Sequence, residues 1–161
     1  MTKKEKFTEI YQQQHAKVFR LCKGYFNGEE ATANDTVQEI FIKVWQHLDS
    51  FRNESMITTW IYRISVNCCL LHARKPSIKK EVHLQQLPDV AQEEYNPVTE
   101  ERLRKMYSCI GELEEAGKLI ILLVLEGVNY PEIAGVLGIS EDTLRVRIHR
   151  IKKSLANCVK L

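Results

Sequence analysis

The chain has 161 residues, of which 44% are hydrophobic and 27% charged, and its formal net charge is +2. This is the composition of an ordinary soluble globular protein with one domain or two small ones, and so small a net charge does not by itself indicate a nucleic-acid partner. The longest apolar run, residues 119–125, is far shorter than a membrane span, and the amino terminus lacks the apolar core of a signal peptide, so we expect a cytoplasmic protein without membrane insertion.

Residues 7–26 carry apolar side chains at helical spacing, and Gly28 follows this predicted helix as a breaker. The next helix has the strongest amphipathic pattern in the chain. Its predicted core face consists of Val37, Ile40, Phe41, Val44, Trp45 and Leu48. The opposite face presents Asp35, Gln38, Glu39 and Ile42, and an exposed Ile42 is either ordinary surface or part of a partner contact.

A third helix is predicted to begin at residue 58 or 59, after a loop, and to end near residue 74. Its predicted buried stripe consists of Ile57, Trp60, Ile61, Ile64, Cys68 and Leu71. Arg63, Asn67 and Arg74 share another face. From periodicity alone two interpretations remain open. Either Trp60 and this basic, amide-bearing flank form a platform for single-stranded bases, or Trp60 is simply core and the arginines are solvated.

Residues 76–97 are predicted to form a linker, because they contain three of the four prolines and little periodicity. A helix follows, with apolar positions at Leu103, Met106, Tyr107, Ile110 and Leu113. By period alone, the run 119–125 suits either a buried strand or a buried helix. We favour a helix, because no other segment of the chain offers a strand to pair with it.

Residues 130–155 carry the clearest pattern for a binding function. Pro131 lies in the first turn of a short predicted helix that Gly138 ends, and Ser140 caps the helix that follows. That second helix has a narrow apolar stripe consisting of Leu144, Ile148, Ile151 and Leu155. Its other faces are basic, and no acid follows Asp142. The pattern predicts a helix-turn-helix whose second helix enters the major groove, since a surface helix with solvated charge usually alternates acids and bases.

Together these predictions give an all-α protein with a small bundle over residues 1–75, a flexible linker over 76–97 and a second bundle over 98–161.

The five cysteines are scattered without the spacing of a zinc site, which fits a reducing cytosol, so we expect no metal and no cofactor. The sequence also lacks a Gly-rich phosphate loop and a nucleophile with a base at a recognised spacing. We therefore expect no enzymatic activity.

The segment DTVQEIFIKVWQHLDSF, followed by TWIYRISVN, resembles the second conserved domain of bacterial σ70-family transcription initiation factors. The match is closest to the small, two-domain extracytoplasmic-function group. The segment LEGVNYPEIAGVLGISEDTLRVRIHRIKKSL resembles the fourth conserved domain of the same family. This resemblance implies a dissociable sigma subunit that recognises −35 and −10 promoter elements and promotes DNA opening. The partners it implies are promoter DNA and the polymerase core, through its β′ clamp and β flap, with an anti-sigma factor as a further candidate.

The resemblance also implies roles for particular residues. The face implied to bind the β′ clamp consists of Asp35, Gln38, Glu39 and Ile42. The residues implied at the −10 element are Phe51, Trp60, Arg63 and Asn67. Those implied at the −35 element are Arg145, Val146, His149 and Arg150, with Arg147 assigned to a phosphate. An apolar Val146 suits a thymine methyl group.

The competing interpretation is a stand-alone helix-turn-helix repressor or activator whose N-terminal bundle dimerises. The outer face of the second predicted helix separates the two. A dimerising bundle usually buries a broad apolar face, whereas this face is mostly polar, which favours the initiation factor.

Overall fold

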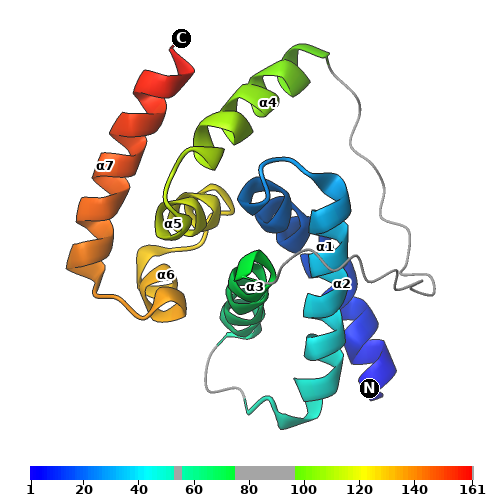
Figure 1. Cartoon of the computed structure of the whole chain (residues 1–161). Coiled ribbons are helices and arrows are strands. Elements are labelled where there is room, and N and C mark those ends of the chain that lie inside the picture. Colours follow the sequence, from blue (N-terminus) through cyan, green and yellow to red (C-terminus); the bar gives the residue numbers. More distant parts are fainter. Residues whose placement is uncertain (53–55, 75–96, 161) are drawn as a thin grey trace.

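The computed structural model describes residues 1–52, 56–74 and 97–160, and every regular element in these ranges is helical (Figure 1). The elements are α1 (Lys3–Tyr25), α2 (Glu30–His47), the short 3-10 helix η1 (Leu48–Ser50), α3 (Ile57–Arg74), α4 (Pro97–Gly111), α5 (Glu115–Leu125), α6 (Tyr130–Leu137) and α7 (Glu141–Val159). The prediction of an all-α protein is therefore confirmed. The predicted linker lies almost entirely outside the described residues.

Helices α1, α2 and α3, which we call the N-terminal unit, pack around the predicted stripe of α2. Val37, Ile40, Phe41 and Val44 are buried, and the Phe41 ring lies 4.7 Å from that of Tyr11 on α1. The prediction was wrong at Trp45, which remains 38% exposed, although Leu48 further along the stripe is buried. The Trp45 ring lies at the edge of the unit, 4.3 Å below the Lys3 ammonium group, where a cation–π contact replaces full burial.

We call helices α4 to α7 the C-terminal unit, in which α4, α6 and α7 pack around α5. Its residues 119–123 are all buried, so the run that could have been a strand is a core helix, as predicted. Leu125, the last residue of that run, is 57% exposed, because the helix ends there and the chain turns out at Gly127. Leu71 on α3 and Leu103 on α4 also lie exposed, although each continues an apolar stripe of its helix.

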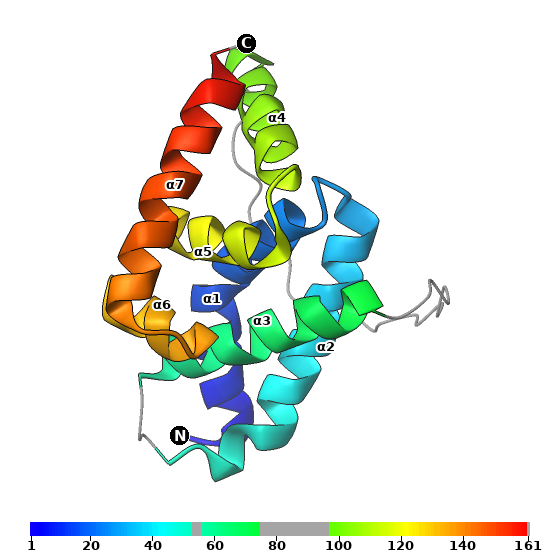
Figure 2. The same ribbon diagram turned by 60° about the vertical axis from the view of Figure 1, so that its left-hand side comes forward.

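The two units pack against each other and share one hydrophobic core. Helix α1 contacts α5 and α4, and α3 contacts α6, so segments about a hundred residues apart lie side by side (Figures 1 and 2). The closest approach is at Gly24 in the last turn of α1, where a Cβ would overlap Leu122 Cδ2 of α5. A side chain at this position would require the Leu122 side chain to shift, which favours glycine near the end of α1.

Polar contacts frame this shared core. The Arg20 guanidinium on α1 donates two hydrogen bonds to the Glu126 carboxylate at the end of α5, Nε to Oε1 at 2.7 Å and Nη2 to Oε2 at 2.9 Å. The Glu126 side chain is only 8% exposed. Such a bidentate pair is strong and directional, and loss of Arg20 would strand a nearly buried carboxylate. At the last residue of α1, Tyr25 Oη donates a hydrogen bond to Glu115 Oε1 at 3.1 Å.

We expect Gly24→Ala to destabilise the protein by about 1–3 kcal/mol, because the added methyl group has to displace a buried leucine. Gly117→Ala is the matched control, since a Cβ there meets nothing closer than 3.7 Å, and better helix propensity should stabilise it by about 0.5–1 kcal/mol. Urea unfolding measures both changes. Adding Leu122→Ala to Gly24→Ala should be less than additive, and equal effects of the two glycine substitutions would refute the close approach.

Candidate nucleic-acid and partner interfaces

The helix-turn-helix is built by local caps at the predicted positions. Asn129 caps α6, its side chain accepting a hydrogen bond from the Glu132 amide at 3.0 Å. Gly138 ends α6 with φ of +69°, in the left-handed region that glycine enters without strain. Ser140 Oγ then accepts from the Thr143 amide at 3.2 Å and starts α7. These caps set where α6 and α7 begin and where α6 ends, through contacts within the segment itself.

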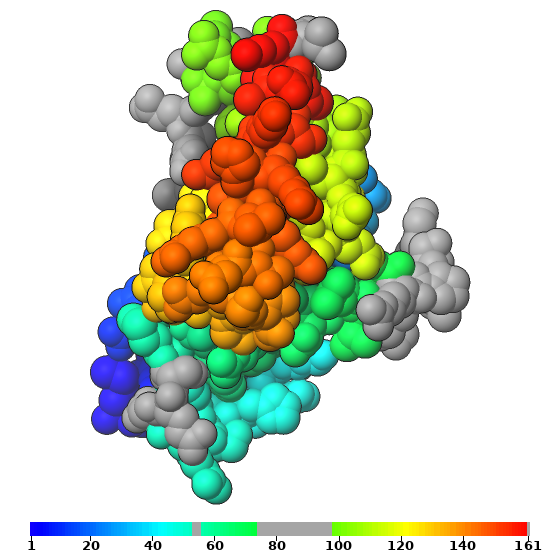
Figure 3. Space-filling view, turned by 90° about the vertical axis from the view of Figure 1, so that its left-hand side faces the viewer, coloured from blue at the N-terminus to red at the C-terminus, as the bar shows by residue number. Residues whose placement is uncertain are grey.

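Helix α7 separates a buried stripe from a basic outer surface. Leu144, Ile148, Ile151 and Leu155 are buried, as predicted. The side chains predicted to meet the −35 element are all exposed: Arg145, Val146, Arg147, His149 and Arg150. Figure 3 shows α7 lying across one face of the molecule, with its outer side uncovered by other elements. Packing of the two units thus leaves this surface accessible.

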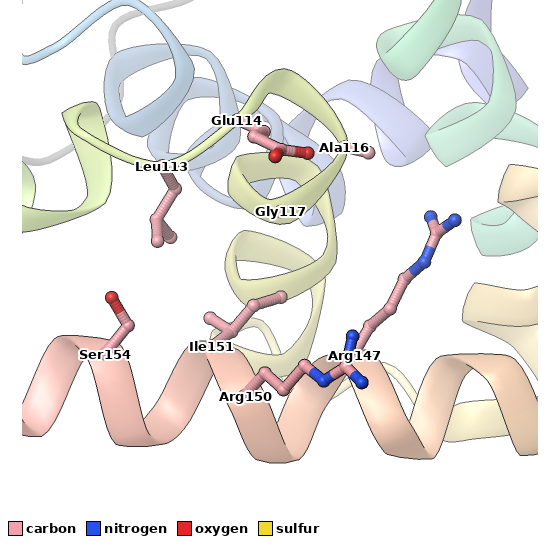
Figure 4. Close-up of a pocket in the computed structure, with 8 residues that line it drawn as sticks. All are labelled: Leu113, Glu114, Ala116, Gly117, Arg147, Arg150, Ile151 and Ser154. Atoms are coloured by element: carbon pink, nitrogen blue, oxygen red, sulfur yellow. The ribbon is translucent and has the colours of Figure 1, made fainter.

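Arg147 lies on a flank of α7, apart from the outward-facing Val146. It lines a groove of about 420 Å³ between α7 and the first turn of α5, together with Arg150 and Ser154 (Figure 4). The exposed amides at the start of α5 carry partial positive charge, although Glu114 also borders the groove. Because Arg150 lines the same groove, this position does not by itself separate the roles of the two arginines.

The predicted −10 residues of α3 form one continuous surface. Phe51 and Trp60 are both half-buried, and their rings lie 5.0 Å apart at 33°. Arg63 and Asn67 lie three and seven residues after Trp60, and both are exposed. Trp60 also packs against the core, so it has one structural contact and one face beside the polar flank. This arrangement can offer an aromatic surface and an amide to an unstacked base.

Helix α6 of the C-terminal unit lies against this same surface. A Cβ added at Gly135 would lie 3.7 Å from Arg63 Nη2, which places the backbone of α6 beside the guanidinium group. No pattern in the sequence indicates this contact. It means that the two candidate DNA surfaces differ in access, since α7 is open while part of the α3 flank faces α6.

The predicted partner face of α2 is exposed over most of its length. Asp35, Glu39 and Ile42 are exposed and Gln38 is partly exposed, with Ile42 at 42%. Helix α2 buries its other side against α1 and α3. One exposed isoleucine among carboxylates and amides gives a small apolar centre with a polar rim, which is the usual composition of a protein interface.

The structure also contains a feature that sequence reasoning missed. Cys109 of α4 and Cys158 of α7 form a disulfide across 49 residues of sequence. The other cysteines, Cys22, Cys68 and Cys69, are buried thiols of the N-terminal unit. Among the described residues, no cluster of side chains could hold a metal ion, and no helix is long and apolar enough to cross a bilayer.

Family comparisons match both units of the chain. Residues 10–77 match the Sigma-70 region 2 family, and residues 103–155 match the Sigma-70 region 4 family. The ECF RNA polymerase sigma-E factor of Escherichia coli K12 is 32% identical over 138 residues, which covers 78% of this chain and 72% of the relative. The sigma-E factor of Haemophilus influenzae is 34% identical over 139 residues, covering 76% and 72%.

Two solved structures share the fold. One is CnrH in complex with the cytosolic domain of CnrY, with a TM-score of 0.74 and 19% identity, covering 98% of this chain and 89% of that chain. The other is the sigma factor RpoE of Bartonella quintana in complex with the anti-sigma factor NepR, with a TM-score of 0.70 and 20% identity, covering 95% and 98%. At these identities the likeness concerns the fold.

Ser140→Ala should destabilise the start of α7 by about 0.5–2 kcal/mol, because the Thr143 amide loses its acceptor. Ser154→Ala is the control, since Ser154 is exposed inside α7 and alanine favours a helix interior. Urea unfolding combined with hydrogen exchange of residues 141–145 would measure the loss. Equal behaviour of the two variants would contradict a capping role for Ser140.

Proposed function

This chain belongs to the extracytoplasmic-function group of σ70-family RNA polymerase sigma factors, and on that premise we propose how its surfaces divide the work of transcription initiation. It is a transcription initiation factor whose partners are the polymerase core and promoter DNA. The observation that carries this conclusion is the presence of region 2 and region 4, in that order, on one chain that aligns with most of an E. coli sigma-E factor. A stand-alone repressor or activator is not favoured, because it would not need region 2.

We assign the outer face of α2 to the polymerase core, at the β′ clamp. Its Asp35 and Glu39 carboxylates are suited to a basic partner surface, and Ile42 supplies an apolar contact at their centre. Charged rims of this kind mainly govern the association rate and specificity. An apolar residue such as Ile42, once it is buried in the complex, contributes more to residence time. The exposure of all three side chains supports this assignment.

We assign the α3 surface to the −10 element. Opening a duplex costs base stacking, which a protein can offset by stacking and hydrogen-bonding the extruded base. The Phe51–Trp60 pair supplies aromatic surface, and the Asn67 amide can donate to and accept from a base edge. Arg63 is exposed on α3 like Asn67, and its guanidinium cation can pair with the phosphates of the strand.

We assign the outer face of α7 to the −35 element. An arginine can bond O6 and N7 of guanine together, so Arg145 and Arg150 can specify sequence, and Val146 can contact a thymine methyl group. Arg145 lies 3.7 Å from Glu141, an exposed pair that is weak enough to exchange for a base. His149 is exposed between these residues, and Arg147 is assigned to phosphate on the family resemblance.

Binding two separate promoter elements requires the two units to separate, at least in part. In the packed arrangement α6 borders Arg63, so α3 cannot present its whole surface to a strand. Separation breaks the Arg20–Glu126 pair and uncovers Leu122. We propose that the polymerase core stabilises the separated units, and that an anti-sigma factor is a further partner that acts on their arrangement.

The core-binding and −35 surfaces should be separable by mutation. Gln38→Ala with Glu39→Lys should weaken binding to core polymerase and reduce transcription from every promoter alike, because it reverses a charge on the assigned core face. Glu101→Lys is the matched charge reversal on exposed α4 and should leave core binding unchanged. Competition for labelled core enzyme measures both variants, and equal losses would refute the assignment of this face.

Arg150→Ala should lower affinity for a cognate −35 duplex by about 1–3 kcal/mol, or roughly tenfold to hundredfold, and leave core binding intact. Arg150→Lys should restore little of this loss, because lysine keeps the charge without the bidentate geometry. Lys153→Ala, which removes a neighbouring charge, should change affinity far less. Footprints on intact and −35-mutated promoters measure these effects, and equal losses on both promoters would show that Arg150 does not read bases.

Asn67→Ala should impair promoter opening more than initial promoter binding, because the lost contact is to an extruded base. A premelted promoter should rescue the variant only partly, since melting is then supplied but the contact is not. Asn34→Ala removes an exposed amide from α2 and serves as the control. Permanganate reactivity of the −10 bases follows opening, and normal reactivity with the Asn67 variant on a duplex promoter would overturn its assignment.

A further inference from the structure

The Cys109–Cys158 disulfide closes a loop that contains nearly all of the C-terminal unit. Cys109 lies in the last turn of α4 and Cys158 in the last turn of α7, with their Cα atoms 5.9 Å apart. The enclosed 49-residue span includes α5, α6 and α7. One bond therefore restrains the unfolded chain of the entire helix-turn-helix and attaches α7, the candidate DNA-reading helix, to α4.

The C-terminal unit depends on outside support for part of its core. Leu122 of α5 packs against Gly24 of α1, and Glu126 finds its partner on Arg20 of the same helix. Both contacts are lost when the units separate to reach two promoter elements. A unit of this size is close to the lower limit for an independent hydrophobic core. A covalent staple therefore matters most in the separated state.

The sulfur atoms of Cys109 and Cys158 differ in solvent exposure, and this difference determines which sulfur an incoming thiolate attacks. Cys109 is 4% exposed, whereas Cys158 is partly exposed at the end of α7. An incoming thiolate therefore reaches Cys158 Sγ and expels the Cys109 thiolate. The Glu112 carboxylate lies 3.9 Å from Cys158 Sγ, where it repels an anionic nucleophile and slows this step. The bond is accessible but not freely exchanging.

The remaining thiols are poor competitors for an oxidant. The neighbouring Cys69 thiol and burial raise the pKa of the Cys22 thiol beyond its ordinary range, and burial raises the pKa of Cys68. All three of these cysteines are buried in the N-terminal unit. Since the thiolate is the reactive form, a mild oxidant acts on the Cys109–Cys158 pair first.

We propose that Cys109 and Cys158 form a reversible thiol–disulfide switch that decides whether the C-terminal unit stays folded, and able to bind −35 DNA, once it separates from the N-terminal unit. This inference rests on the proposed function.

Oxidation uses a low-molecular-weight disulfide, RSSR. Cys158 thiolate attacks one sulfur and releases one RSH, then Cys109 thiolate attacks Cys158 Sγ and releases the second. The two cysteine thiols lose two electrons, RSSR gains them, and two protons pass to the released thiols.

The test uses the full chain, equilibrated with either oxidised glutathione or excess dithiothreitol. Arg20→Ala weakens the contact between the units by removing the Arg20–Glu126 pair, and the doubly substituted Cys109→Ala, Cys158→Ala chain is the redox-insensitive control. Hydrogen exchange of α5 to α7 reports folding, and anisotropy of a labelled −35 duplex reports binding. We expect reduction to lower α7 protection at least ~tenfold in the Arg20→Ala chain but only ~two- to threefold in the wild type, whose units support each other.

Peptide mapping after oxidation should find Cys109 joined to Cys158 and the three N-terminal thiols free. Equal protection of the oxidised and reduced Arg20→Ala chains would overturn the proposal, as would a redox response in the control chain or a bond between Cys22 and Cys69. These readouts need no polymerase. A chain that passes them but fails to start transcription with core enzyme would refute the proposed function and not the switch.

The exchange route has its own test. Glu112→Gln should accelerate reduction of the disulfide by dithiothreitol about two- to tenfold, because a repelling charge beside Cys158 is removed. Glu114→Gln removes an exposed carboxylate from the same loop, two residues further along, and should change the rate little. Samples quenched by alkylation at intervals and read by intact mass, which counts the cysteines freed in the protein, measure both rates. Equal rates for the two variants would refute entry at Cys158.

Discussion

Burial of α5 on every side is the constraint on which the rest of the arrangement depends. Five consecutive buried residues turn through more than a full circle, because the helix has about 3.6 residues per turn. No single neighbour can cover such a helix, so α1, α4, α6 and α7 all contact it. Each buried leucine or isoleucine stabilises the folded state by about 1.5–3 kcal/mol. The core of the C-terminal unit is therefore complete only with α1, or another partner, packed against α5.

The candidate surfaces are predictable from sequence because they are set locally. Asn129, Gly138 and Ser140 fix the helix-turn-helix through contacts within three or four residues, and periodicity then fixes which side of α7 faces outward. The same logic separates the core face of α2 from the face with Asp35 and Ile42. Family resemblance adds roles to these surfaces, and those roles remain assignments to be tested by the variants proposed above.

The contacts between units were not predictable, because nothing in a local pattern marks them. Gly24 lies inside the helix predicted over residues 7–26, and Leu122 looks like any core leucine until α1 is placed against it. Periodicity likewise places Trp45 and Leu71 in the core, although both side chains are exposed in the structure. The cysteine pair spans 49 residues on two helices, so spacing rules for metal sites or short loops do not detect it.

The long sequence separation between Arg20 and Glu126 has a consequence during synthesis. These partners lie 106 residues apart, and a ribosome adding 5–20 residues per second needs about 5 to 20 s to pass from one to the other. Throughout that interval α1 lacks the α5 side chain, Leu122, that packs against Gly24 in the finished chain. Part of the apolar surface of α1 therefore stays uncovered until α5 has been made, so formation of the shared core waits for the C-terminal half of the chain.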